Sequence, residues 1–156
     1  MKNIFYVFTF SLLLTSCGPD FLLNEEREVL SESWQYEDLK FFDVSINDVS
    51  LKYNLHLLVT HSKEYDYENV YMKIHTKFPT KDKREEQITI QLANKRGEWE
   101  GKCNSSSCTV KVFLLESFKF PEKGDYTFSF EQFTRDSELV GIEKLHLQLF
   151  PMKEKS

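Results

Sequence analysis

The residues best equipped for chemistry in this 156-residue chain are its three cysteines. Cys17 follows Leu14, Thr15 and Ser16, a branched apolar residue and two small ones. Small residues let the backbone lie flat in a peptidase groove, and the thiol can accept a thioether-linked diacylglycerol. This spacing is typical of a bacterial lipobox and predicts cleavage before Cys17 and acylation of its sulfur.

The residues before Cys17 indicate export. Lys2 provides one positive charge, and residues 4–14 form an 11-residue apolar run, the layout of a secretory signal. As a helix the run would span about 16 Å, against a hydrocarbon core of about 30 Å, so it is too short for a transmembrane anchor. Residues 1–16 are therefore predicted to be a lipoprotein signal peptide. The alternative is an ordinary signal in which the cysteine stands by chance.

Four polar residues separate the other two cysteines, Cys103 and Cys108. In an oxidising envelope compartment, a pair this close around a turn favours a local disulfide. The alternatives are two free thiols or a metal site. A zinc site would need two more soft ligands within sequence reach, and none is present, so no metal or other cofactor is predicted.

Cleavage would leave a chain long enough for one domain with a single core. Loss of Lys2 changes the formal net charge from −5 to −6, whereas a nucleic-acid-binding protein would need a basic face. Residues 17–33 are mixed and acidic and are predicted to be the lipidated N-terminus and a tether whose end packs on the domain. The domain is expected over residues 34–151, followed by a polar tail at 152–156.

Within the predicted domain, apolar and polar residues alternate with a period of two, the pattern of strands with one wet face. Such runs must cover their apolar sides, and two sheets packed face to face do so economically. The sequence therefore predicts an all-β fold, an antiparallel two-sheet β-sandwich of seven or eight strands. Jelly-roll and immunoglobulin-like connections both remain open.

Two of these runs, residues 49–61 and 70–78, are predicted to pair as one long hairpin. If His61 lies opposite Val70, the apolar positions of both strands face the same side. That register also places His56 opposite His75 on the wet face. Two solvated imidazoles are expected there, because two ligands alone make only a weak metal site.

Several short motifs follow one another along the chain: Tyr65-Asp66-Tyr67-Glu68-Asn69-Val70-Tyr71, then Gly97-Glu98-Trp99-Glu100-Gly101, then Gln132, Arg135, Leu139 and Gly141-Ile142. In order and spacing they resemble the gliding-motility lipoprotein family GldH of Bacteroidetes, whose pattern includes Y-x-Y-x-N-L-Y. With the lipobox, the resemblance extends from Cys17 to about Leu149. The two-cysteine loop is not part of that pattern.

The resemblance implies an envelope lipoprotein that faces the periplasm, is required for gliding and is not an enzyme. The chain also has no G-x-S-x-G elbow, H-E-x-x-H or phosphate-binding glycine loop. Its partners would be the membrane, through the lipid, and other envelope proteins of the gliding or secretion machinery. An acidic run directly after Cys17 would argue for export to the cell surface. None follows it here, so the inner face of the outer membrane is favoured.

The predicted partner-binding residues are Tyr65, Tyr67, Asn69 and Tyr71. Tyrosine combines a large contact area with a polar tip, which interfaces favour; alternatively, Asn69 caps a turn and the rings cover the edge of the core. Trp99 is either a core plug or a sugar-stacking platform. A carbohydrate-binding lipoprotein is therefore the alternative function, and a hydrolase is a third. Arg135 is expected in a surface ion pair with nearby carboxylates.

Overall fold

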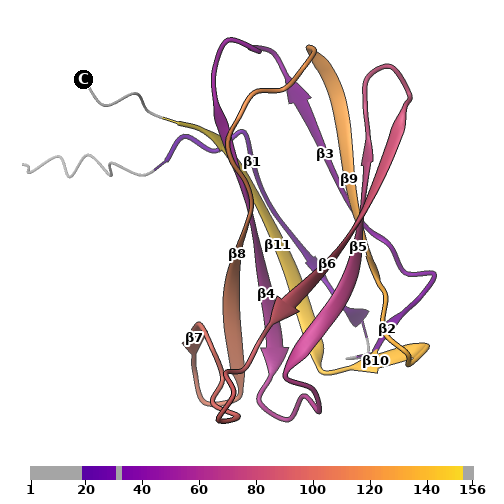
Figure 1. The fold of residues 1–156 in the computed structure, drawn as a ribbon, viewed down its shortest axis with the longest axis vertical. Helices are drawn as coiled ribbons and strands as arrows, with labels where there is room; N and C mark the ends of the chain where they lie inside the picture. The colour runs from indigo at the N-terminus through magenta and orange to yellow at the C-terminus, as the bar shows by residue number, and fades with distance from the viewer. Residues whose placement is uncertain (1–18, 31–32, 153–156) are drawn as a thin grey trace, which may run out of the picture.

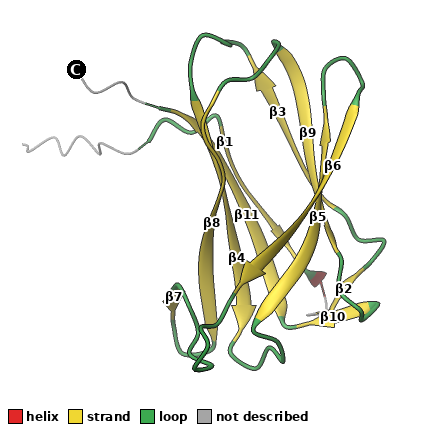
Figure 2. Ribbon diagram, in the orientation of Figure 1, coloured by secondary structure: helices red, strands yellow, loops and turns green. Residues whose placement is uncertain are grey.

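The computed structural model describes residues 19–30 and 33–152. These residues form antiparallel β-sheets and contain no α-helix; the short red segment in Figure 2 is the 3-10 residue Leu30. None of their segments is a helix long and apolar enough to cross a bilayer. The predicted signal peptide, Cys17 and most of the polar tail lie outside the described residues, so acylation stays a prediction.

The described residues form eleven strands in three sheets (Figure 1). One sheet has the order β1-β11-β4-β8-β7, the second β3-β9-β5-β6, and the third pairs β10 with β2. The strands are β1 (Leu23–Glu28), β2 (Ser33–Gln35), β3 (Lys40–Ile46), β4 (Tyr53–Ser62), β5 (Asn69–Lys77), β6 (Lys83–Gln91), β7 (Lys102–Cys103), β8 (Ser107–Phe118), β9 (Gly124–Gln132), β10 (Glu138–Val140) and β11 (Ile142–Pro151).

The two larger sheets face each other, and their inward side chains form one hydrophobic core (Figure 1). The period-two pattern places these side chains: on β3, Phe42, Val44 and Ile46 are buried while the residues between them are exposed. The all-β antiparallel prediction is therefore confirmed. The expected seven or eight strands in two sheets are wrong, because β2, β7 and β10 have only two or three residues and show no period in the sequence.

Strand β1 lies in the segment that the sequence analysis assigned to a tether, and this is a correction. Its residues pair along β11, with Glu25 opposite Leu147 and Arg27 opposite Leu145. Opposed residues share a face, so both charges occupy inward positions of an edge strand. Arg27 Nε donates a hydrogen bond to the carbonyl of Phe41 across the edge of the core, at 2.9 Å. Charges at such positions protect sheet edges from further pairing, but they also remove the alternation that identifies a strand.

The predicted hairpin between residues 49–61 and 70–78 is wrong. Strand β4 pairs with β11 and β8, whereas β5 pairs with β6 and β9 in the opposite sheet. Residues 63–68 connect the two layers instead of turning within one. The period of two shows which residues face the core, but apolar faces that meet across a core have the same pattern as faces that lie side by side.

Candidate functional site

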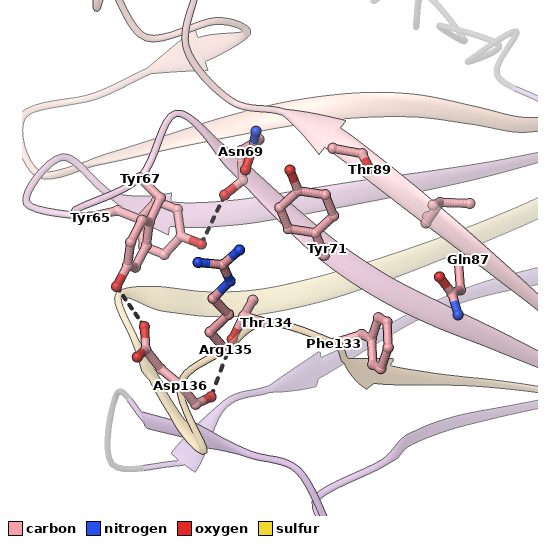
Figure 3. A pocket seen from close by; sticks show the side chains of 11 residues that line it. Tyr65, Tyr67, Asn69, Tyr71, Gln87, Thr89, Phe133, Thr134, Arg135 and Asp136 are labelled. Atoms are coloured by element: carbon pink, nitrogen blue, oxygen red, sulfur yellow. Dashed lines mark hydrogen bonds between the residues drawn. The ribbon is translucent and has the colours of Figure 1, made fainter.

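A pocket of about 740 Å³ opens where β5 and β6 meet the turn that follows β9 (Figure 3). This tyrosine pocket is lined by Tyr65, Tyr67, Asn69, Tyr71, Gln87, Ile88, Thr89, Phe133, Thr134, Arg135 and Asp136. All four predicted partner-binding residues therefore lie together. That they bind a partner remains a prediction.

Tyr65 forms the floor of the pocket. Its side chain is buried, and its hydroxyl donates a hydrogen bond to the carbonyl of Asn69 at 3.1 Å (Figure 3). Burial raises the pKa of the Tyr65 hydroxyl well above its ordinary value of 10. Gly141 packs against this ring with a φ of +94°, and a Cβ at that position would lie 3.1 Å from Tyr65 Cδ2. A close approach in the left-handed region favours glycine there.

Three aromatic side chains form the rim of the pocket and remain accessible. Tyr67 is 47% exposed, Tyr71 46% and Phe133 42%. The Tyr67 hydroxyl donates a hydrogen bond to Asp136 Oδ2 at 2.5 Å (Figure 3), and this bond to a carboxylate raises the pKa of Tyr67. Rings with one polar tip and an open face are well suited to bind a partner's apolar group.

Gln132, fully buried, holds the turn that supplies the other wall. Its Nε2 donates to the carbonyl of Asp136 at 2.9 Å, and its Oε1 accepts from the Thr134 backbone N–H at 3.0 Å and the Thr134 hydroxyl at 2.7 Å. The Tyr36 hydroxyl donates to the Thr134 carbonyl from the opposite side, at 2.8 Å. The buried amide and the Tyr36 hydroxyl together therefore hold the turn of residues 133–136 in place.

Arg135 projects into the middle of the pocket (Figure 3). Its guanidinium makes no ion pair or hydrogen bond with any part of the chain that the structure describes. The expected ion pair of Arg135 with Asp136 or Glu138 is not formed among the described residues, and Asp136 instead accepts the Tyr67 hydroxyl. A second cation lies beside the rim, since Lys73 Nζ is 4.4 Å from the centre of the Phe133 ring. The pocket therefore offers an uncompensated guanidinium among aromatic rings.

The sequence analysis missed the contribution of β6 and of the turn after β9. Gln87 and Thr89 line the pocket because β6 pairs with β5, with Thr89 opposite Tyr71. Phe133 joins the pocket because its N–H donates to the Tyr71 carbonyl at 2.8 Å. The family motif did contain Gln132 and Arg135 and was the available signal, although it could not show that they approach the tyrosines.

The two histidines that were expected to face each other lie in different sheets. His56 is 5% exposed, with its ring between Phe113 and Phe150 at centroid distances of 4.7 and 4.9 Å. His75 contacts two carboxylates, with Nε2 2.8 Å from Glu131 Oε2 and Nδ1 3.4 Å from Glu85 Oε2. Within residues 19–30 and 33–152, no group of three or more histidine, cysteine or acidic side chains is arranged to bind a metal ion.

Trp99 and the two later cysteines lie at the β7–β8 end of the molecule. Trp99 is half-buried, with its ring 4.6 Å from that of His61 and packed against the core, as a core plug would be. The Cys103 and Cys108 sulfurs are 2.00 Å apart, at disulfide distance, and the two residues pair directly across β7 and β8. The two sulfurs therefore lie at bonding distance, and the disulfide stays a prediction.

Comparison with known proteins shows the family. An uncharacterized Listeria monocytogenes protein of known structure is 17% identical, with a TM-score of 0.40 over 79% of this chain and 9% of that one; a likeness this distant carries no inference. The gliding motility lipoprotein GldH of Flavobacterium johnsoniae is 26% identical over 93% of this chain and 90% of that protein. A GldH homolog from Christiangramia forsetii is 26% identical over 93% and 91%. Residues 22–149 match the family model for GldH lipoprotein, and the chain therefore belongs to the GldH lipoprotein family.

Proposed function

We propose that this protein is a lipid-anchored envelope component required for gliding motility, and that it acts without catalysis by binding a partner protein at the tyrosine pocket. The family supports the role in gliding, and the lipobox at Cys17 supports the anchor. The lipid would hold the domain on a membrane facing the periplasm, with the outer membrane favoured. The observation that carries the contact mechanism is the unpaired Arg135 guanidinium within an exposed aromatic rim.

The composition of the pocket supports binding rather than catalysis. Of its lining residues only Asp136 is a carboxylate, and it already accepts a hydrogen bond from Tyr67. The lining includes no histidine or cysteine, the usual general base and the strongest nucleophile among side chains. Exposed tyrosines around an arginine instead have the composition of an interface hot spot.

The charge of the pocket specifies the chemistry of the partner. A guanidinium binds a carboxylate through two parallel hydrogen bonds. The surrounding rings of Tyr67, Tyr71 and Phe133 would cover an apolar group next to that carboxylate. The partner segment is therefore proposed to carry an acidic side chain, or a chain-terminal carboxylate, beside a hydrophobic residue.

Substitution of Arg135 tests this mechanism. Arg135→Ala should abolish gliding of cells that carry it as their only copy, and should remove the partner that co-purifies with the wild-type protein from native envelopes. Arg96→Ala is the matched control, because Arg96 is an exposed arginine in the loop before Trp99. Normal gliding and recovery of the partner with both Arg135→Ala and Tyr71→Ala would contradict contact at this pocket.

The anchor is tested separately at Cys17. Cys17→Ser should abolish incorporation of labelled palmitate and release the protein from the membrane fraction, because serine cannot carry the thioether-linked lipid. A serine variant that still partitions with membranes and takes up the label would refute the lipoprotein assignment.

A carbohydrate-binding lipoprotein is the second candidate, and the three accessible rings around one pocket favour it. Sugars bind to flat ring faces, so an envelope polysaccharide would also lose affinity with Tyr71→Ala. Calorimetric titration with the purified polysaccharides of the producing cells separates the two functions. Saturable binding that depends on Tyr71, together with normal recovery of protein partners by the variant, would favour the glycan.

A further inference from the structure

A second aromatic surface lies on the outer face of the five-stranded sheet. It consists of Phe21, Phe150, His56 and Phe113, here called the aromatic row. Successive ring centroids are 5.5, 4.9 and 4.7 Å apart, and each contact is edge to face. His56 and Phe113 are opposite each other on β4 and β8, and Phe150 belongs to the neighbouring β11. The row therefore crosses three adjacent strands and continues to Phe21, two residues before β1.

The row is apolar and open to the outside. Phe113 is 56% exposed, and Leu22 beside Phe21 is 42% exposed. His56 is nearly inaccessible although it lies on an outer face, because the two phenylalanines cover it. Its Nδ1 has no hydrogen-bond partner. The two rings therefore shield this nitrogen, which is unusual for the wet side of a sheet.

The row lies where the described chain begins. Phe21 is four residues after Cys17, and four extended residues span at most about 14 Å. The start of β1 and the end of β11 lie together on the side of the molecule away from the four-stranded sheet (Figure 1). A lipid on Cys17 would therefore bring the bilayer surface within reach of the row.

We propose that the aromatic row docks on the bilayer that holds the Cys17 lipid, and so orients the domain with its tyrosine pocket facing away from the membrane. This inference rests on the proposed acylation. Phenylalanine rings can enter the boundary between headgroups and acyl chains, where the apolar faces of interfacial elements lie. Lys111 Nζ is 5.3 Å from the centre of the Phe113 ring, and its long stem allows the ammonium to reach the phosphates while the ring inserts.

Two charged side chains lie near the row: Lys111 over the Phe113 ring and Glu116, whose charge acts on His56. The ion pair of the same face is distant from it. Lys144 and Glu26 pair at 2.8 Å, and Lys144 is six positions from Phe150 along β11, about 20 Å in an extended strand. The apolar end of the face is thus the end next to the anchor. The mature chain is acidic overall, so zwitterionic lipid is the appropriate surface for a test.

A tryptophan placed in the row reports contact with lipid. The acylated protein is reconstituted into phosphatidylcholine vesicles with or without bromine on the upper acyl chain, and fluorescence is compared for Phe113→Trp and Phe41→Trp. Phe41 is the matched control, because it is 52% exposed on the outer face of the opposite sheet. The native Trp34 and Trp99 contribute equally to both variants. Bromine should quench Phe113→Trp beyond the native background and leave Phe41→Trp at that background.

Each outcome has a distinct meaning. Equal quenching of the two variants in vesicles that have incorporated the acylated protein overturns the docking but leaves the anchor and the pocket intact. Failure of the protein with intact Cys17 to enter vesicles overturns both the anchor and this inference. If Phe113→Trp is unquenched and the protein sediments as a dimer that Phe113→Ser dissociates, the row is a contact between two copies, and bilayer docking is wrong.

Discussion

The outer faces of the two large sheets both carry exposed aromatic side chains, but in different surroundings. On the five-stranded sheet, the rings of the aromatic row contact one another and enclose a partnerless His56 nitrogen. On the four-stranded sheet, the rings of the tyrosine pocket surround a free guanidinium and a hydrogen-bonded carboxylate. The same class of side chain therefore forms an apolar contact surface in one place and a polar recognition site in the other.

The two surfaces also differ in what supports them. Three rings of the aromatic row, Phe150, His56 and Phe113, stand on the adjacent strands β11, β4 and β8 and take their positions from the strand pairing, with a register shift beside His56. The tyrosine pocket depends on a turn that is held by one buried amide and on a ring that is packed against a glycine. Changes beneath the pocket should therefore be costly, and comparable changes at the row should be mild.

The largest expected effect is at Gln132. Gln132→Met keeps the size of the side chain but leaves the Thr134 N–H and the Asp136 carbonyl without their buried partner, at a cost of about 2–4 kcal/mol. Urea unfolding followed by circular dichroism measures this loss. The control is Gln148→Met on the outer face of the five-stranded sheet, where the amide bonds only to Asn24; it should cost at most about 0.5 kcal/mol. Equal losses would show that the pocket wall does not depend on the buried amide.

A smaller effect is expected at Gly141. Gly141→Ala forces a side chain into the left-handed region, which costs about 1–2 kcal/mol, and presses the new Cβ against Tyr65. Gly97→Ala isolates the backbone cost, because Gly97 has a φ of +77° and no heavy atom within 4 Å of an added Cβ. Thermal unfolding should show Gly141→Ala to be the more destabilising by roughly 1 kcal/mol or more. If the two substitutions lower the free energy of unfolding equally, the Tyr65 ring moves aside easily and is not a rigid floor of the pocket.

The pH dependence of stability provides a third test, with one histidine near each surface. Burial lowers the pKa of His56 in the row and of His61, whose ring lies 6.0 Å from that of Tyr65. Because both folded-state pKa values lie below the unfolded value of about 6.5, protonation favours unfolding. The contribution of the two neutral imidazoles to the free energy of unfolding is fully present above about pH 6.5. It is lost as the pH falls from there toward the folded-state pKa values.

Substitution of each histidine assigns this loss. His56→Phe and His61→Phe should each reduce the fall in the free energy of unfolding between pH 7 and pH 5, measured by urea titration. The carboxylate of Glu26 contributes only at lower pH, because its hydrogen bond with Lys144 lowers its pKa from 4.5. An unchanged slope in both variants would mean that other groups dominate acid sensitivity.

Period-two patterning could predict which residues are buried, but not which sheet they join. It predicted the inward positions of β3 and β11, since each strand has one apolar and one polar side. It misassigned the pairing of β4 and β5, because a crossing between layers and a turn within a layer look the same in the sequence. It missed β1 because Glu25 and Arg27 occupy inward positions there. The tyrosine residues were predicted from one local motif, whereas Gln132 and Arg135 reach them only through the fold.

The smallest expected effect on stability separates the aromatic row from the core. Phe113→Ser should lower the free energy of unfolding by less than about 1 kcal/mol, because more than half of the side chain is already exposed and little apolar area is lost. Phe41→Ser on the opposite sheet should behave alike. The variants should differ at His56, because Phe113→Ser uncovers that imidazole and lets its pKa rise toward 6.5, while Phe41→Ser leaves it lowered. An NMR titration of the His56 ring protons distinguishes them. A loss of several kcal/mol with Phe113→Ser would instead place the row within the folding core and remove it as a free surface.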